Sequence, residues 1–260
     1  MKKILVIGAT GSIGQHVVEY ALKENIDVRA LVRDQQRGEE LLSSQAELYV
    51  GDATDEATLA EAAKGVDGII LTHSAHSPRS AIEAVDYGVV KKLLRAVSDQ
   101  QLHIVLMTSF GVTAPEQPHN IELGILDWKR RSERLLRLSG QTYTVVRPGW
   151  FDYNEKDERS IVFLQGDPLR SGTPQAGRIA RDQIARVLVS SLLTQQARNK
   201  TFELIAEPGE EQSSLVPLFS RLMADVKGDP NGVLDPDTLP IINEPDYVQA
   251  DLNEGSLIRT

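Results

Sequence analysis

The sequence KILVIGATGSIG occupies residues 3–14 and decides the fold class. It begins with a short run of apolar side chains, Ile4 to Ile7, which is typical of a strand buried on both faces. Glycines follow at positions 8, 11 and 14, and apolar residues then recur at helical spacing up to about Glu24. A strand, a glycine-rich turn and a helix in this order predict a corner that binds a dinucleotide.

Each glycine of this corner has its own physical reason. Gly8 permits a sharp turn, Gly11 lets the backbone approach a pyrophosphate, and Gly14 lets the helix pack closely on the strand. Free N–H groups at the start of the helix then face the anion. The alternative is a glycine-rich turn without a ligand. The residues that we expect to hold the dinucleotide here are Gly8, Thr10, Gly11, Ser12, Ile13 and Gly14.

The strand–helix rhythm continues after this corner. Further apolar strands are predicted at residues 28–32, 47–50, 66–71, 103–108 and 142–146. Thr54 is expected to cap a helix after the third strand, and longer helices are expected at 78–100 and 123–139. Alternation of this kind predicts right-handed crossovers and a doubly wound parallel sheet, the Rossmann-type α/β class, over residues 1–150.

The rhythm weakens after residue 150. Residues 151–226 are expected to form a small C-terminal lobe that completes the same domain and holds the substrate. It would contain a late strand at 201–205 and a last helix at 214–226. Residues 227–260 are rich in Pro, Asp and Asn, so we expect an extended tail that is ordered only if it packs on something.

Composition excludes several function classes. The chain has 28 Lys and Arg against 37 Asp and Glu, a net charge of −9, and no local basic patch, so neither nucleic acid nor a membrane is an expected partner. It has no cysteine, which excludes disulfides, thiolate zinc sites and thiol nucleophiles. No apolar run is long enough for a membrane span or a signal peptide. We expect a cytoplasmic protein with a small-molecule substrate, and a homodimer stays open.

The second strand carries the signal for cofactor preference, because it ends in Val32-Arg33-Asp34. An acidic side chain at this edge would bond the ribose 2′-hydroxyl of NAD, whereas a cation would neutralise the 2′-phosphate of NADP. Arg33 comes first and its planar fork suits phosphate, so we expect NADP, with NAD left open by Asp34. Asp52 and Ala53 follow the third strand beside the expected adenine, where Asp52 is either a hydrogen-bond acceptor or a turn residue.

Together these motifs resemble the atypical short-chain dehydrogenase/reductase superfamily. The resemblance is to its NAD(P)H-binding group, which includes NmrA-like and biliverdin reductase B-like proteins, and it covers roughly residues 1–206. It rests on segments 8–14, 31–33, 51–52, 107–109, 128–129 with Glu133, 143–149 and 179–185.

The resemblance implies a sheet of order 3-2-1-4-5-6 with a seventh strand. It also implies that NADP lies across the strand ends, with Thr72 or His73 near the ribose and Pro148 near the nicotinamide. Lys129 matches a lysine that contacts the cofactor ribose. The alternative for Lys129 is a solvated helix lysine beside Arg130.

Active members of the superfamily use a Ser, a Tyr and a Lys, with the Tyr four residues before the Lys. Ser109 matches the Ser and Lys129 the Lys, so both are candidate catalytic residues, but Ile125 stands at the Tyr position. Reduction of a carbonyl by hydride leaves an oxyanion that needs a proton. Ser109 or a water could relay that proton, a flavin or quinone could take it from solvent, or the protein could bind the nucleotide without catalysis.

We therefore predict an NADP(H)-dependent oxidoreductase that acts on a small planar or carbonyl acceptor, and a non-catalytic nucleotide sensor as the alternative. Aromatic residues 150–153 would stack on a flat substrate or form a small core. His73 and His76 lie at the mouth of the predicted cleft, as proton donors or as ordinary loop residues. With His119 they lack the spacing of a metal site, so no metal is predicted.

Overall fold

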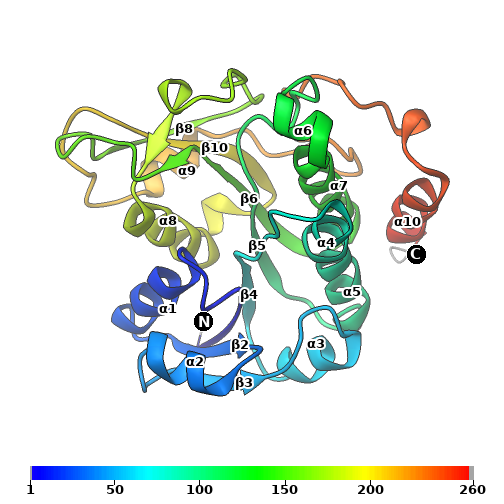
Figure 1. Ribbon diagram of the computed structural model, residues 1–260. Coiled ribbons are helices and arrows are strands. Elements are labelled where there is room, and N and C mark those ends of the chain that lie inside the picture. Colours follow the sequence, from blue (N-terminus) through cyan, green and yellow to red (C-terminus); the bar gives the residue numbers. More distant parts are fainter. Residues whose placement is uncertain (1, 258–260) are drawn as a thin grey trace.

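The computed structural model describes residues 2–257 and shows one eight-stranded sheet with the order β3-β2-β1-β4-β5-β6-β10-β8 (Figure 1). All neighbouring strands are parallel except β10 and β8, which are antiparallel. The expected strand order and the seventh strand, β10, are thus confirmed, and β8 adds an edge. The strands are β1 (Lys3–Ile7), β2 (Asp27–Val32), β3 (Glu47–Val50), β4 (Gly68–Leu71), β5 (His103–Met107), β6 (Thr142–Pro148), β8 (Ser160–Leu164) and β10 (Lys200–Glu207).

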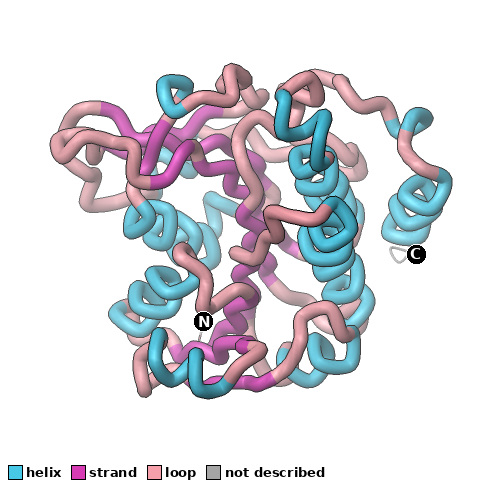
Figure 2. Tube along the Cα trace, in the orientation of Figure 1, coloured by secondary structure: helices cyan, strands magenta, loops and turns pink. Residues whose placement is uncertain are grey.

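Helices cover both faces of this sheet (Figure 2). Along β1, Ile4 and Val6 join one core cluster, while Leu5 and Ile7 join the other. The first cluster is covered by α1 (Gly14–Lys23) and α8 (Arg181–Leu193). The second is covered by α3 (Glu56–Ala62), α5 (Gly88–Ala96) and α7 (Ile125–Leu138). A continuous apolar strand is therefore what a sheet with two covered faces requires.

Several predicted helices differ in detail. The helix expected at 78–100 is divided into α4 (Arg79–Ile82), a π-helix at Glu83–Tyr87 and α5, which ends at Ala96. Asp55, not Thr54, caps α3, because its carboxylate accepts a hydrogen bond from Thr58 N at 3.0 Å. The Thr54 hydroxyl instead donates to Asp52 Oδ1 at 2.8 Å. Two short helices, α2 (Gln35–Leu41) and α6 (Pro118–Leu123), are additions to the prediction.

The part of the chain after residue 150 holds more regular structure than expected. Strands β7 (Trp150–Phe151) and β9 (Arg178–Ile179) form a second, two-stranded sheet. Helix α9 (Val216–Arg221) is shorter than predicted and is not the last helix, because α10 (Asp246–Leu257) lies in the segment that we expected to be an extended tail. Short 3₁₀ helices occupy Pro174–Ala176, Gln195–Ala197 and Ile241–Asn243.

The tail is ordered because it satisfies arginines of α7. Arg130, Arg131 and Arg134 are all buried, and a buried guanidinium is costly unless it is paired and hydrogen-bonded. Arg130 donates to Thr238 Oγ1 at 2.7 Å, and Arg134 donates to the Leu239 carbonyl at 2.6 Å. The Glu244 carboxylate then accepts from Arg131 and Arg134 at 2.6 and 2.8 Å. Residues 238–244 are thereby bound along the outer face of α7.

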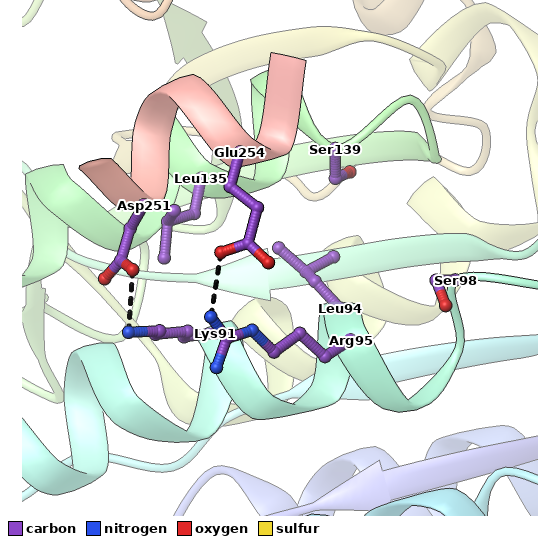
Figure 3. Close-up of a pocket in the computed structure, with 8 residues that line it drawn as sticks. All are labelled: Lys91, Leu94, Arg95, Ser98, Leu135, Ser139, Asp251 and Glu254. Atoms are coloured by element: carbon purple, nitrogen blue, oxygen red, sulfur yellow. Dashed lines mark hydrogen bonds and ion pairs between the residues drawn. The ribbon is translucent and has the colours of Figure 1, made fainter. Parts of the chain in front are cut away.

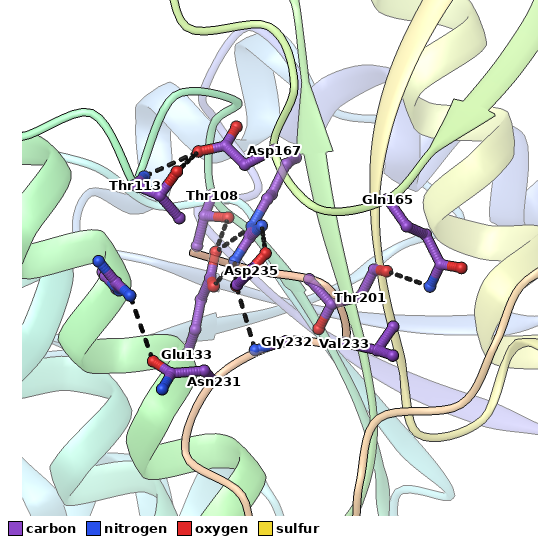
Figure 4. Close-up of polar contacts among 12 residues, drawn as sticks. Thr108, Thr113, Glu133, Gln165, Asp167, Thr201, Asn231, Gly232, Val233 and Asp235 are labelled. Carbon is purple, nitrogen blue, oxygen red and sulfur yellow. Dashed lines mark hydrogen bonds and ion pairs between the residues drawn. The ribbon is translucent and has the colours of Figure 1, made fainter. Parts of the chain in front are cut away.

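A buried ionic network lies under this segment (Figure 4). Glu133 of α7 accepts hydrogen bonds from Arg147 of β6 at 2.6 Å and from Thr108 at 2.6 Å. Burial by itself would raise the pKa of Glu133, but Arg147 and Arg137 lower it to about 2. Asp235 of the tail also binds Arg147, at 2.7 Å. The network joins α7, the carboxyl ends of β5 and β6, and the tail.

Helix α10 packs against α5 and α7 (Figure 3). Its Val248 and Leu252 are buried in the second core cluster. Lys91 of α5 pairs with Asp251 at 2.7 Å, and the exposed Arg95 pairs with Glu254 at 2.8 Å. The chain end therefore covers a helix face that the Rossmann core alone would leave open.

We predict that Asp235→Ala lowers the free energy of unfolding by about 2–3 kcal/mol, because it removes buried charged hydrogen bonds of Arg147. Urea unfolding measures this change. The control Glu254→Ala breaks an exposed pair and is expected to change stability by less than about 1 kcal/mol. Equal effects of the two substitutions would contradict the structural role given to the buried network.

Candidate functional site

A long cleft of about 1290 Å³ opens along the carboxyl ends of the parallel strands. Its lining comes from the loops after β1, β2, β3, β4, β5 and β6, and so crosses the point between β1 and β4 where the strand order reverses. Open α/β sheets bind ligands at this point. Pockets for small ligands usually measure about 300–1,000 Å³, so this cleft has room for an extended ligand together with a second molecule.

The structure brings nearly all of the site residues predicted from sequence to this one cleft. Those that line it are Gly8, Thr10, Gly11, Ser12, Ile13, Arg33, Asp52, Ala53, Thr72, His73, Ser109, Lys129 and Pro148. Gly14 is the exception. A Cβ at Gly14 would lie 2.1 Å from the Gly8 carbonyl oxygen and 2.8 Å from Ala9 Cα, so its part is close packing of α1 on the corner. The ligand contacts of the others stay predictions.

The glycine corner is shaped by close backbone approach. Gly8 has a φ of +89°, and a Cβ there would lie 2.7 Å from His73 N. Gly11 N donates to the Gly8 carbonyl at 2.9 Å, which closes the turn. Helix α1 then begins after Ile13, a residue that supplies no side-chain hydrogen bond to the helix N-terminus. This end of α1 is open for the anionic group that its dipole favours.

The groups after β2 and β3 have clear partners. Asp34 caps α2, because its carboxylate accepts a hydrogen bond from Arg37 N at 2.8 Å. Arg33 and Arg37 both line the cleft, and neither forms a salt bridge with any residue between 2 and 257. Asp52 accepts hydrogen bonds from the Thr54 amide and hydroxyl, which lower the pKa of Asp52. This edge therefore presents two guanidinium groups that have no salt bridge within residues 2–257, while Asp34 caps a helix and Asp52 stabilises a turn.

Thr72 and His73 follow β4 beside the corner. Thr72 Oγ1 donates to the Ile7 and Gly8 carbonyls, each at 3.3 Å, and so ties the end of β4 to the glycine turn. His73 Nδ1 is buried and has no hydrogen-bond partner among the described residues. Burial lowers the pKa of His73 to about 4, so the ring is neutral at pH 7 and is not an imidazolium donor. The neutral ring can instead accept a hydrogen bond from a bound hydroxyl.

Ser109 and Lys129 lie in the same cleft but in different settings. The Ser109 hydroxyl donates to the Phe110 carbonyl at 3.0 Å. Lys129 is not a solvated lysine, because its Nζ donates to Asp86 Oδ1 at 2.6 Å and to Ser74 Oγ at 3.0 Å. Ile125 also lines the cleft, so the position that resembles the usual tyrosine faces the cleft without a hydroxyl.

Ser74 and Asp86 are site residues that the sequence reasoning missed. A signal for Asp86 was present, since it is a carboxylate in an apolar helical stretch with Val85, Val89 and Val90. An unpaired charge is costly on a buried helix face, which indicates a buried cationic partner. Identifying Lys129 as that partner required the tertiary structure.

The end of the cleft after β6 is aromatic. Trp150 and Tyr153 pack edge to face with their ring centroids 5.8 Å apart. The guanidinium of Arg181 lies 5.6 Å from the centre of the Phe151 ring and is paired with Asp152. All three aromatic side chains line the cleft, so this end suits a flat, largely apolar ligand.

Metal sites and membrane spans are not seen in residues 2–257. These residues contain no group of three or more His, Asp or Glu arranged to hold a metal ion, and the side chain of His119 lies outside the described part of the chain. The predicted absence of a metal stays a prediction. No helix in this range has the length and apolar character needed to cross a membrane.

Comparison with known proteins explains why these residues meet. The model of the NAD(P)H-binding family matches residues 8–195. The chain belongs to this NAD(P)H-binding family. The match begins at the glycine corner, directly after β1, and ends just after α8, so it includes strands β2 to β6 and the loops after them that line the cleft.

The sequence identity between this chain and individual relatives is low. Sanguinarine reductase from Eschscholzia californica is 28% identical, over 84% of this chain and 95% of its own. The photosystem II assembly factor Ycf39 from Trieres chinensis is 28% identical, over 84% of this chain and 68% of its own. The short-chain dehydrogenase/reductase from Veillonella parvula in complex with NADP superposes with a TM-score of 0.61 at 16% identity, over 82% of this chain and 99% of its own. This last likeness shows the fold.

We predict that Gly14→Ala lowers the free energy of unfolding by about 1–3 kcal/mol, because its Cβ overlaps the backbone of the corner. The matched control is Gly88→Ala in α5, whose Cβ would make an ordinary contact 3.6 Å from the Glu83 carbonyl. Urea unfolding of the two variants compares them. A Gly14→Ala protein as stable as Gly88→Ala would contradict the close packing described for α1.

Proposed function

We propose that this protein is an NADP(H)-dependent oxidoreductase that transfers hydride to a small planar or carbonyl acceptor. The observation that carries the proposal is the continuity of the cleft. One cavity joins the glycine corner, where a diphosphate fits, to a pocket that contains Ser109 and the aromatic residues 150–153. A bound nicotinamide cofactor would supply hydride, and the aromatic end has room for the acceptor.

The residues present fit such a cofactor. The open N-terminus of α1 and the bare backbone of Gly11 suit the diphosphate. Arg33 and Arg37 suit a 2′-phosphate, because guanidinium groups bind phosphate through paired hydrogen bonds and the nearby Asp34 is occupied as a helix cap. The buried, unpartnered His73 Nδ1 suits a ribose hydroxyl. Ser109 would then polarise the acceptor by a hydrogen bond.

The relatives support this proposal in different ways. One relative is named as a reductase, and a structure of the same fold was solved with NADP. A second candidate function, a nucleotide-dependent assembly or regulatory role without turnover, is favoured by Ile125 at the tyrosine position and by the relative that is named as an assembly factor. The two candidates differ in whether NADPH is consumed.

We predict that Arg33→Ala weakens NADPH binding about 10- to 100-fold, as expected for the loss of a charged hydrogen bond to phosphate, and leaves NADH binding within about twofold. Isothermal titration calorimetry measures both affinities. The exposed Arg221, which does not line the cleft, provides the control Arg221→Ala. A parallel loss of NADPH and NADH affinity in Arg33→Ala would contradict the proposed preference for NADP.

Turnover decides between the two candidate functions. We predict that the unaltered protein oxidises NADPH in the presence of at least one acceptor from a panel of quinones, flavins and aromatic carbonyls. The loss of absorbance of the reduced nicotinamide measures this oxidation. Ser109→Ala is expected to slow this oxidation at least tenfold while nucleotide affinity is retained. Tight NADPH binding without oxidation by any acceptor would reject the oxidoreductase in favour of the regulatory role.

A further inference from the structure

Lys129, Asp86 and Ser74 form a polar set at the wall of the cleft, beside the position that lacks the tyrosine. We propose that the Ser74 hydroxyl is the proton donor to the acceptor and that the Lys129 ammonium resupplies its proton. Asp86 is the positioning residue of this set. The inference rests on the oxidoreductase function proposed above and names the group that completes its chemistry.

The contacts within the set are short and mutual. Lys129 Nζ lies 2.6 Å from Asp86 Oδ1 and 3.0 Å from Ser74 Oγ, and Ser74 Oγ lies 2.9 Å from the same Asp86 oxygen. The side chain of Asp86 is 2% exposed and that of Lys129 is 10% exposed, so the pair is largely shielded from solvent. Ser74 and Lys129 both line the cleft together with Ile125.

A local irregularity of the backbone places Asp86. It lies in the π-helix Glu83–Tyr87, between α4 and α5, and such π-turns are frequent at functional sites. Its carbonyl oxygen accepts a hydrogen bond from the Ser132 hydroxyl of α7 at 2.6 Å. Its second carboxylate oxygen accepts from Ala75 N at 2.9 Å. Both carboxylate oxygens of Asp86 are therefore hydrogen-bonded, and they hold the loop after β4 close to Lys129.

This arrangement supplies what the missing tyrosine would have supplied. The Lys129 ammonium carries the proton that a relay needs, and the buried Asp86 carboxylate holds it 2.6 Å away, beside Ser74. Ser74 is the hydroxyl that bonds this ammonium within the described part of the chain. Both Ser74 and Ser109 donate their hydroxyl proton within the protein, to Asp86 Oδ1 and to the Phe110 carbonyl, but Ser74 also accepts a hydrogen bond from an ammonium. His73 is neutral at pH 7. Ser74 is thus the cleft hydroxyl with a proton source directly behind it.

The proposed step balances as follows for a carbonyl or quinone. Hydride, with its two electrons, passes from the reduced nicotinamide to the acceptor, and the acceptor oxygen takes the hydroxyl proton of Ser74. The Ser74 oxygen takes a proton from the Lys129 ammonium, which becomes a neutral amine and is recharged by solvent. An acceptor with a cationic C=N⁺ bond is neutralised by hydride alone and needs no proton. The two acceptor classes should therefore depend on Ser74 differently.

The test compares Ser74→Ala with Ser80→Ala, an exposed serine of α4 that does not line the cleft. Single-turnover oxidation of NADPH is followed with a benzoquinone and with an N-methylated aromatic cation that accepts hydride at carbon. Ser74→Ala is expected to slow the quinone reaction about 100-fold, the usual scale of general acid catalysis, and to leave the cation reaction within about twofold. Ser80→Ala should change neither reaction, and Ser74→Thr should restore the quinone rate.

Two readouts separate this role from a structural one. Calorimetry should give the same NADPH affinity for Ser74→Ala as for the unaltered protein. Asp86→Asn should slow the quinone reaction and leave the cation reaction within about twofold, because Lys129 and Ser74 lose the carboxylate that holds them together.

The outcomes distinguish this inference from the proposed function. If the unaltered protein reduces the quinone and Ser74→Ala does so equally well, or slows both acceptors equally, Ser74 is not the proton donor although the oxidoreductase stands. If Asp86→Asn leaves the quinone reaction unchanged, or slows both acceptors equally, the positioning role of Asp86 is wrong. If none of the acceptors tested leads to NADPH oxidation by the unaltered protein, the proposed function and this inference fail together.

Discussion

The close approach of Gly14 to the Gly8 carbonyl is the constraint from which the rest of the site follows. It brings the start of α1 against the end of β1, and Thr72 ties the end of β4 to the same turn. The cleft then opens between the loops that follow β1 and β4, where the strand order reverses. A side chain at Gly8 or Gly14 would meet backbone atoms, which cannot rotate away, so this geometry depends on the absence of side chains.

A second constraint acts on the other wall of the cleft. The ion pair of Glu133 and Arg147 fixes α7 on the sheet. Glu133 also accepts a hydrogen bond from Thr108, which holds the end of the strand that precedes Ser109. The same helix carries Lys129 into the cleft and presents arginines to the tail on its outer side. One buried ionic network thus positions the candidate catalytic groups and orders the chain end.

The sequence predicts the parts of this structure that depend on local signals. The apolar run of β1, the glycine spacing and the strand–helix rhythm predict a doubly wound parallel sheet and its glycine corner, because these signals come from short-range chemistry. The strand order and the places of Thr72, Ser109 and Lys129 were expected from the family resemblance, and all three residues line the cleft. Prediction from the sequence fails for the parts of the structure that depend on contacts between residues far apart in the chain. The sequence alone does not show that the arginines of α7 are buried by residues 231–244. It also does not identify Lys129 as the partner of Asp86. Strand β8 was not predicted, because its apolar residues 161–164 lie within a polar, turn-rich stretch of sequence.

The central claim is that bare backbone amides of the N-terminal corner bind the diphosphate of a nicotinamide dinucleotide. The most direct measurement is a titration of the unaltered, folded protein with NADPH, followed by the fluorescence of the reduced nicotinamide, with pyrophosphate and adenosine 2′,5′-bisphosphate as competitors. The claim predicts one site per chain with micromolar or tighter affinity, and displacement by both competitors. Failure of both NADPH and NADH to bind at millimolar concentration would contradict it.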